Sequence, residues 1–415
     1  MKNRVVTFGC RLNTYESSVI QELSEQAGLK EAIIINTCAV TQEAERQACQ
    51  SIRKLRRENP HATLIVTGCA AQINADKFSS MKEVNFVIGN QEKMSLDIYK
   101  NLNDQKVIVN DIFSLQETAL HMVSSFEGKV RAFIEIQNGC NHRCTFCIIP
   151  FGRGNSRSIP IGEIVKQVRH LLEQGFLEIV FTGVDITSYG EDLPGEPTLG
   201  EMIKRLLALV PELKRLRLSS LDPVEVDPAL WMLIESEPRL LPHFHISLQA
   251  GDDLILKRMK RRHLRHHIVD FCRRVHQYRP SAAIGADIIA GFPTETEEHF
   301  MNTFRLLEEC RITHSHIFPY SPRPGTPASR IPPVAPAVVK ERAKRLRDEG
   351  KRMTEHYLQS WIGKTDNVLI ESMNKDVSKG KTDHFLPVHI NQITEEPVIE
   401  AKITGSTQET LLAIF

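Results

Sequence analysis

The chain has 415 residues, which is long for a single hydrophobic core and favours several domains. Its 52 Lys and Arg residues nearly balance its 51 Asp and Glu residues, which excludes nucleic-acid binding through net charge alone. No apolar run approaches the length that spans a membrane, and the N-terminus lacks the apolar core of a signal peptide. We therefore expect a cytoplasmic protein that makes no contact with membranes, whose cysteines are metal ligands, reactive thiols or core residues.

Residues 1–120 alternate short apolar runs with charged segments of about one helix length. Small or polar residues bound each run, as is typical of strands in a parallel α/β sheet. The runs are Arg4–Phe8, Ala32–Ile35, Thr63–Val66 and Asn85–Ile88. This pattern predicts an N-terminal parallel α/β domain.

Residues 126–360 repeat the alternation through about six β/α units, which predicts a barrel or a partial barrel. The expected strands are Ala132–Gln137, Glu178–Thr182, Arg215–Ser219, His243–Leu248, Ala283–Ile289 and His314–Phe318. A Pro-rich linker follows from Ser321, and a basic helix is expected over Val338–Trp361.

Residues 361–415 differ in sequence pattern from the preceding segment. They are expected to form short strands separated by Gly, Asn and Asp. The expected strands are Asn367–Ile370, Phe385–Ile390, Val398–Ile403 and Leu411–Ile414. They predict a small antiparallel β-barrel as a third domain.

The most informative motif is Cys140-Asn-His-Arg-Cys144-Thr-Phe-Cys147. It follows the first expected barrel strand and so falls at the C-terminal face, where barrel enzymes build active sites. An iron–sulfur cubane usually takes four thiolates, so three neighbouring thiolates leave one iron open to another ligand. The motif predicts a [4Fe–4S] cluster of this kind, and the alternative is a zinc site with His142 as fourth ligand.

Three dispersed cysteines, Cys10, Cys38 and Cys69, each come at or just after the end of an expected N-terminal strand. Because the carboxyl ends of parallel strands share one edge of a sheet, we expect these thiols to meet there. They then form a second three-thiolate site, the alternative being buried structural thiols. The cysteines interpreted as core residues of helices are Cys49, Cys272 and Cys310.

The Cys140–Cys147 spacing after a first barrel strand resembles the radical S-adenosylmethionine superfamily. The three N-terminal cysteines, the sequence Ile-Ile-Pro150-Phe-Gly-Arg153-Gly and a small C-terminal β domain narrow this resemblance to the methylthiotransferases, over essentially the whole chain. Gly380–Val388 resembles part of a TRAM domain, an RNA-binding β-barrel. The resemblance implies a radical-SAM barrel between two flanking domains, S-adenosylmethionine and two [4Fe–4S] clusters.

Local sequences point to one branch of that family. Thr7-Phe-Gly-Cys10-Arg-Leu-Asn13, Asn36-Thr-Cys38 and Arg153–Ser158 resemble the branch that modifies threonylcarbamoyladenosine in tRNA. The isopentenyladenosine branch typically reads Gly-Cys-Gln-Met-Asn at the first site, and the ribosomal-protein branch Gly-Cys-Pro-Lys-Asn. The implied reaction puts a methylthio group on C2 of N6-threonylcarbamoyladenosine 37, next to the anticodon.

Our hypothesis assigns two roles to S-adenosylmethionine: one molecule methylates a sulfur on the N-terminal cluster, and another yields the radical. Contacts to S-adenosylmethionine are expected at strand ends after the cluster loop. The residues expected to make them are Gly183, Ser220, Gln249, Asp287 and Arg153. For the polar residues, the alternative is a turn or strand-end bond to backbone. Arg153 and Arg157 could instead bind RNA phosphate or remain solvated loop charges.

The implied partners are a tRNA anticodon stem-loop and a reducing protein such as a flavodoxin-type electron donor, while the sulfur donor stays open. The run Lys257–Arg262 is expected to contact phosphate near the active site, whereas Arg53–Arg57 reads as a solvated helix face. Three histidines that follow the basic run are interpreted as surface or packing residues: His263, His266 and His267. Three alternatives remain: isopentenyladenosine tRNA or a ribosomal-protein aspartate as substrate, or a zinc-stabilised RNA-binding protein without catalysis.

Overall fold

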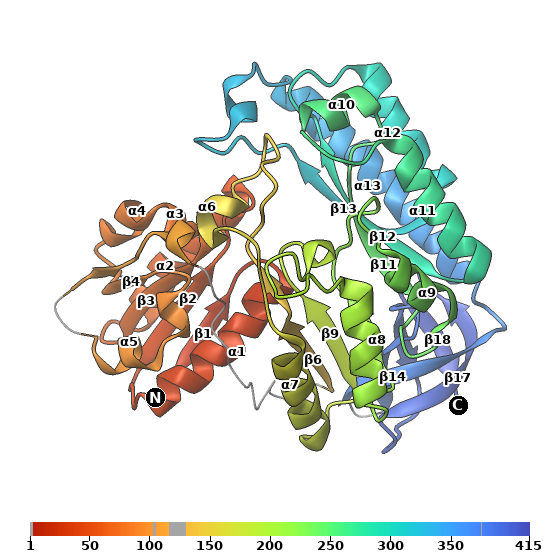
Figure 1. The fold of residues 1–415 in the computed structure, drawn as a ribbon, viewed down its shortest axis with the longest axis horizontal. Coiled ribbons are helices and arrows are strands. Elements are labelled where there is room, and N and C mark those ends of the chain that lie inside the picture. The colour runs from red at the N-terminus through yellow and green to blue at the C-terminus, as the bar shows by residue number, and fades with distance from the viewer. Residues whose placement is uncertain (1–2, 103–104, 116–129, 375) are drawn as a thin grey trace.

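The structure is a computed structural model that describes residues 3–102, 105–115, 130–374 and 376–415. In Figure 1 the N-terminal elements lie on the left, the central strands and helices in the middle and right, and the C-terminal strands at the lower right. Among the described residues, no helix has the length and apolarity to span a membrane. The boundary expected between residues 120 and 126 lies outside the described residues, and the one at 360 stays a prediction.

The N-terminal sheet has five strands, all parallel, in the order β1-β2-β3-β4-β5. The strands are β1 (Arg4–Thr7), β2 (Ala32–Thr37), β3 (Thr63–Gly68), β4 (Phe86–Ile88) and β5 (Val107–Ile108). The helices and 3-10 turns are α1 (Arg11–Gln26), α2 (Gln42–Glu58), α3 (Cys69–Ile73), α4 (Ala75–Ser79), η1 (Glu92–Met94), α5 (Leu96–Lys100) and η2 (Ile112–Ser114). The predicted parallel α/β domain is confirmed, with a fifth, short strand that the sequence pattern did not indicate.

The central strands form two parallel three-stranded sheets, β6-β9-β10 and β11-β12-β13. Isolated bridges Leu216↔Leu240 and Leu221↔Ile246 join them, so six strands follow one another in chain order as an open, partial barrel. The strands are β6 (Arg131–Glu135), β9 (Glu178–Thr182), β10 (Leu216–Leu218), β11 (His243–Gln249), β12 (Ala283–Ala290) and β13 (Ile312–Pro319). The partial barrel predicted from the repeating units is confirmed.

The strand expected over Ala132–Gln137 is split, because the chain leaves β6 and pairs again as β7 (Gln137–Asn138) with β8 (Arg157–Ser158). This short antiparallel pair closes the base of the cysteine loop. The other central elements are α6 (Ile149–Arg153), α7 (Ile161–Glu173), η3 (Ile186–Ser188), α8 (Leu199–Leu209), α9 (Pro228–Ser236), α10 (Asp253–Arg258), α11 (Arg265–Tyr278), α12 (Glu297–Glu309), η4 (Pro327–Arg330) and α13 (Pro336–Gln359).

The C-terminal strands close into a barrel in the order β14-β15-β16-β18-β17. They are β14 (Thr365–Asn374), β15 (Val377–Thr382), β16 (Pro387–Ile390), β17 (Val398–Ser406) and β18 (Leu411–Ile414). The barrel is confirmed with one correction: β16 pairs with β18 in parallel, while the other pairs are antiparallel. The sequence pattern missed β15 because its inward positions are small or polar, Ser378, Gly380 and Thr382.

A buried ion cluster attaches the C-terminal barrel to the central strands. The carboxylate of Glu178, which is fully buried, pairs with Arg131, Arg215 and Arg217. Arg131 also pairs with Glu371 of β14, and Arg215 pairs with Asp383, which follows β15. These three cations lower the pKa of Glu178 to about 2 in spite of its burial.

Candidate active site

The cysteine loop lies between β7 and α6, at the C-terminal ends of the barrel strands. The amide of Cys140 donates to the carbonyl of Gly154 at 3.1 Å, which fixes the start of the loop against the chain before β8. Gly139 has φ +73°, and a Cβ there would lie 1.8 Å from the carbonyl oxygen of Asn155, so only glycine fits. Across the loop, Thr145 donates its amide to Met259 O at 3.0 Å and its hydroxyl to Arg258 O at 2.8 Å.

The thiols of this loop are partly buried beside one cation and one anion. Nη1 of Arg261 lies 3.6 Å from Sγ of Cys144, and Oδ2 of Asp185 lies 3.8 Å from Sγ of Cys140. Burial raises the pKa of Cys140 and of Cys147 to about 12. Because a desolvated thiol ionises only when a cationic group binds it, this chemistry fits a metal-binding loop.

The second set of thiols lies where the parallel sheet predicts it. Cys38 and Cys69 directly follow β2 and β3, and Cys10 comes just after β1. Gly68 has φ +95°, and a Cβ there would lie 2.4 Å from the Thr37 backbone. The two strand ends can approach closely because this position is glycine. The expectation that three thiols share one sheet edge is therefore confirmed in its placement.

Contacts around these thiols also indicate a built site. A Cβ on Gly9 would lie 3.0 Å from Sγ of Cys38, and Nδ2 of Asn90 lies 3.6 Å from Sγ of Cys69. Burial raises the pKa of Cys38 to about 12, with smaller contributions from the neighbouring Cys69 and Cys10. The three thiols therefore lie close enough to interact electrostatically.

The described side chains include two compact groups of possible metal ligands. A tetrahedral zinc ion with bonds of about 2.3 Å brings its sulfur ligands within about 4 Å of one another. Among the described residues, the two groups of ligand atoms that lie within 4.8 Å of one another are Cys140–His142–Asp185 and His245–Asp287–His316. Neither contains two cysteines, and the first includes His142, the fourth ligand in the zinc alternative.

A cavity of about 570 Å³ lies between the N-terminal sheet and the barrel. Cys10 and Cys38 line it from the sheet side. Four of the five residues expected to contact the cofactor line it from the barrel side: Gly183, Ser220, Gln249 and Asp287. The structure therefore brings four of the predicted cofactor residues and two cysteines of the second set to one cavity.

Gly183 and Gln137 make structural contacts that the sequence did not reveal. A Cβ on Gly183 would lie 2.6 Å from the backbone oxygen of Gln137, so glycine is needed for the two chain segments to approach each other. Oε1 of Gln137 accepts from the amides of Val184 at 3.0 Å and Asp185 at 2.9 Å, which ties the end of β9 to the cysteine loop. No motif singles out Gln137, because its role depends on the fold.

Asp287 is held by two imidazoles within the cavity. Its Oδ1 lies 3.0 Å from Nε2 of His245 and 3.1 Å from Nδ1 of His316. These bonds lower the pKa of Asp287 well below its ordinary value, although burial opposes the shift. The sequence pattern indicated neither histidine; they lie on β11 and β13, the two strands that flank β12.

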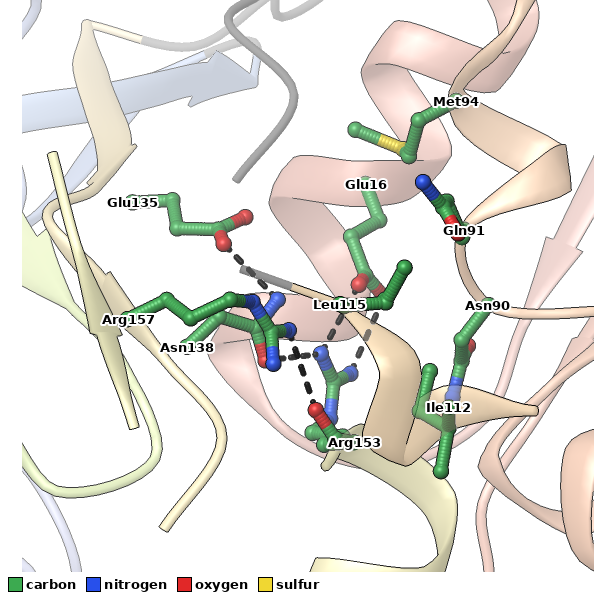
Figure 2. A pocket seen from close by; sticks show the side chains of 10 residues that line it. All are labelled: Glu16, Asn90, Gln91, Met94, Ile112, Leu115, Glu135, Asn138, Arg153 and Arg157. Atoms are coloured by element: carbon green, nitrogen blue, oxygen red, sulfur yellow. Dashed lines mark hydrogen bonds and ion pairs between the residues drawn. The ribbon is translucent and has the colours of Figure 1, made fainter. Parts of the chain in front are cut away.

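The structure does not bring Arg153 into the cavity, which corrects the expectation that it contacts S-adenosylmethionine or RNA. Figure 2 shows its guanidinium pointing from α6 toward Glu16 of α1. It donates to both carboxylate oxygens of Glu16, at 2.8 and 3.0 Å, and to Asn13 Oδ1 at 2.7 Å. Arg153 is 3% exposed, so it joins the N-terminal domain to the barrel instead. Arg157 likewise donates to backbone oxygens of Arg153 and Asn155.

The basic run also differs from its predicted role. Arg261 pairs with Asp222 at 2.8 Å, and Arg262 pairs with Glu225 and contacts His142. Both arginines therefore contact the cysteine loop, Arg261 at Cys144 and Arg262 at His142. Lys257 and Lys260 are exposed. His263 is fully buried and bonded to Asp222 and to the Leu248 carbonyl, which agrees with a packing role.

Comparison with known proteins identifies the family. The model of the radical SAM superfamily matches residues 134–307, and that of the "Uncharacterized protein family UPF0004" matches residues 2–89. The threonylcarbamoyladenosine tRNA methylthiotransferase MtaB of Rickettsia prowazekii (strain Madrid E) is 53% identical, covering 98% of this chain and 95% of the relative. The protein of the same name from Aquifex aeolicus (strain VF5) is 36% identical, covering 92% and 96%.

The chain belongs to the radical S-adenosylmethionine methylthiotransferases. The resemblance inferred from its motifs is confirmed, and the methylthiotransferase of Rickettsia carries the name of the expected branch. A tRNA-2-methylthio-N(6)-dimethylallyladenosine synthase of Ehrlichia canis (strain Jake) is 30% identical, covering 99% and 98%. Membership of this superfamily implies S-adenosylmethionine and a [4Fe–4S] cluster.

Solved structures agree with this fold. The radical S-adenosylmethionine methyltransferase TsrM from Kitasatospora setae, with cobalamin and a [4Fe–4S] cluster bound, superposes with a TM-score of 0.58 at 14% identity, covering 79% of this methylthiotransferase and 77% of that chain. The cobalamin-dependent S-adenosylmethionine radical enzyme OxsB matches with a TM-score of 0.51 at 11% identity, covering 86% and 56%. At such identities these likenesses concern the fold alone.

Proposed function

We propose that this methylthiotransferase modifies tRNA, replacing the C2 hydrogen of N6-threonylcarbamoyladenosine 37 with a methylthio group. The observation that carries the proposal is the single cavity shared by Cys10 and Cys38 and by the barrel residues expected around S-adenosylmethionine. The name of the 53% identical relative supports the substrate. The dimethylallyladenosine synthase is a more distant relative at 30% identity, which places the alternative tRNA substrate second.

Two three-thiolate sites serve this reaction. Cys140, Cys144 and Cys147 hold the [4Fe–4S] cluster of the superfamily, and Cys10, Cys38 and Cys69 hold a second one. When bound, the first cluster and S-adenosylmethionine supply the 5′-deoxyadenosyl radical that the strong C2–H bond requires, and the second cluster carries the sulfur. Membership of the radical SAM superfamily supports a cluster over zinc at the first site.

The side chains around the cavity bind, orient and exclude water. Gly183, Ser220 and Gln249 approach S-adenosylmethionine from the strand ends, and Asp287 is fixed for hydrogen bonding by its two histidines. Apolar walls contributed by Phe146, Ile289 and Phe318 keep water from the reacting carbon. Arg261 places positive charge beside Cys144, where it stabilises an anionic cluster.

The tRNA approaches over the barrel face, and the C-terminal β-barrel contributes to its binding. The target base must leave its stack to reach the cavity, which the unpaired loop of an anticodon permits. Exposed Lys257 and Lys260 on and after α10 contact phosphate. A flavodoxin-type reducing protein supplies electrons in the cytoplasm. The three domains of the enzyme cover residues 1–120, 126–360 and 361–415.

The test is product analysis with anaerobically reconstituted enzyme. Three substrates are offered: an anticodon stem-loop with N6-threonylcarbamoyladenosine, one with N6-isopentenyladenosine, and ribosomal protein. Mass spectrometry should find the methylthio product on the first alone, and none when the reductant is omitted. A methylthio product on either of the others, with the first unmodified, refutes the proposed substrate.

A further inference from the structure

Arg11 is a cation in the cavity that the reaction described above does not use. It directly follows Cys10 and is the first residue of α1. Among the described residues that line the cavity, it is the single Lys or Arg. The cavity wall therefore carries one permanent positive charge, adjacent to the second set of cysteines.

The surroundings of Arg11 leave it ready to bind an anion. Within the described part of the chain its guanidinium has no hydrogen bond and no ion pair, and its nearest specific contact is the Phe385 ring, 5.5 Å from Cζ. The ring of Phe385 also contacts the guanidinium groups of Arg131 and Arg217, so two further cations lie near Arg11. A guanidinium in this state gains more from a carboxylate than one that is solvated or paired.

Two further features of the same wall favour an anion. The N-terminal turn of the 16-residue helix α1 has no side-chain cap and no acidic residue, so its free N–H groups add positive potential beside Arg11. The carboxylate that lines the cavity, Asp287, is already bonded to His245 and His316. It therefore does not neutralise Arg11 through a direct contact.

We propose that Arg11 recognises the carboxylate of the threonyl group on the substrate base and thereby selects threonylcarbamoyladenosine over adenosines with uncharged N6 substituents. The inference rests on the proposed function. The N6 substituent and C2 both lie on the Watson–Crick edge of adenine. When C2 faces the cysteine triad that includes Cys10, the threonyl group lies along the same wall, which Arg11 lines. A bidentate guanidinium–carboxylate pair then determines both the affinity for the RNA and the position of C2 in the cavity.

The experiment compares two anticodon stem-loops, one with N6-threonylcarbamoyladenosine and one in which its carboxylate is a carboxamide. Reconstituted holoenzyme is assayed as wild type, Arg11→Gln, Arg11→Lys and the control Arg4→Gln, an exposed arginine of β1 outside the cavity. The readouts are kcat/KM for methylthiolation, KM for S-adenosylmethionine, and the Kd of each RNA by fluorescence anisotropy. Iron content verifies that each variant is folded and loaded.

Wild type and Arg4→Gln should prefer the carboxylate RNA by about 10- to 100-fold, as expected for a charge-assisted hydrogen-bonded pair. In Arg11→Gln the preference should fall to near unity, with Arg11→Lys in between. A wild type without preference, or an Arg11→Gln variant that keeps it, overturns the inference. So does a rise in KM for S-adenosylmethionine with the RNA preference intact, which would assign Arg11 to the cofactor carboxylate.

Failure of the proposed function is a separate result. If wild-type enzyme methylthiolates neither RNA, the proposed reaction is wrong. The ratio of the two Kd values still decides whether Arg11 reads the carboxylate. If Arg11→Gln does not load iron, the Arg11→Lys variant and the wild-type preference carry the decision.

Discussion

The buried pair between Arg153 and Glu16 should determine whether the two cysteine sites work together. Arg153 lies in the barrel domain and Glu16 in the N-terminal domain, and both are at most 3% exposed. Arg153 and Lys93 hold the pKa of Glu16 at about 2, below its ordinary 4.5, although burial acts in the opposite direction. At about 1.4 kcal/mol per pKa unit, the favourable surroundings of the Glu16 carboxylate are worth about 3 kcal/mol.

Replacing Arg153 with methionine keeps the volume of the side chain but removes its charge and its bonds to Glu16, Asn13 and Asn138. Lys93 remains, 2.6 Å from Glu16, so we expect a loss of about 2 to 3 kcal/mol rather than the full value. That corresponds to a fall in Tm of about 5–10 °C. The barrel itself should keep its cluster loop, because Cys140 and Gly154 bond through backbone atoms.

The assay measures 5′-deoxyadenosine and methylthio nucleoside in the same anaerobic reaction, together with Tm by calorimetry. Arg153→Met should still cleave S-adenosylmethionine but form at least tenfold less methylthio product per cleavage, because a small displacement between reacting groups is costly. Arg169→Met is the matched control, since that guanidinium is exposed and donates to one carbonyl, Leu209 O. A variant with unchanged Tm and unchanged product per cleavage would refute the reasoning.

Three further predictions follow from the buried charges. Glu178→Gln leaves Arg131, Arg215 and Arg217 without their shared carboxylate, so Tm should fall by about 10 °C. Limited proteolysis should also cut the variant sooner than the wild type between α13 and β14. Equal proteolysis rates would contradict this prediction. Arg261→Met removes the cation beside Cys144. The reduction potential of the cluster at Cys144 should become more negative by on the order of 50 mV in an EPR-monitored titration. An unchanged or raised potential would contradict this prediction. The folded-state pKa values of Glu16, Glu178 and Asp222 are lowered to about 2, so the stability that these groups contribute is present above their ordinary values and is lost as pH falls from about 4.5 toward 2. The Tm of cluster-free protein should therefore drop steeply in that interval, and a Tm that is flat across it would count against these pairs.

The sequence predicts most of the fold because apolar runs and cysteines obey simple rules of parallel sheets. Cys10, Cys38 and Cys69 are far apart in the chain, but each comes near a strand end, so topology alone brings them to one edge. The same reasoning placed Gly183 and Asp287 in the cavity. These predictions need only strand order and direction.

The rest depends on pairings that no local pattern encodes. Arg153 lies in a motif that suggests ligand binding, but its partner is Glu16, 137 positions earlier. Arg261 and Arg262 lie in a run that suggests phosphate contact, but the fold brings Asp222 and Glu225 beside them. β15 escaped detection because its buried positions are Ser, Gly and Thr, which carry no apolar alternation.

The division of labour between the two cysteine triads can be tested by a single reaction series with wild type, Cys10→Ala and Cys140→Ala. For each protein, iron content, 5′-deoxyadenosine and the methylthio product on threonylcarbamoyladenosine RNA are measured together. We predict about eight irons in wild type and about four in each variant. Cys10→Ala should cleave S-adenosylmethionine without forming the methylthio product, and Cys140→Ala should do neither. Methylthio product from Cys10→Ala, or cleavage by Cys140→Ala, would contradict the account.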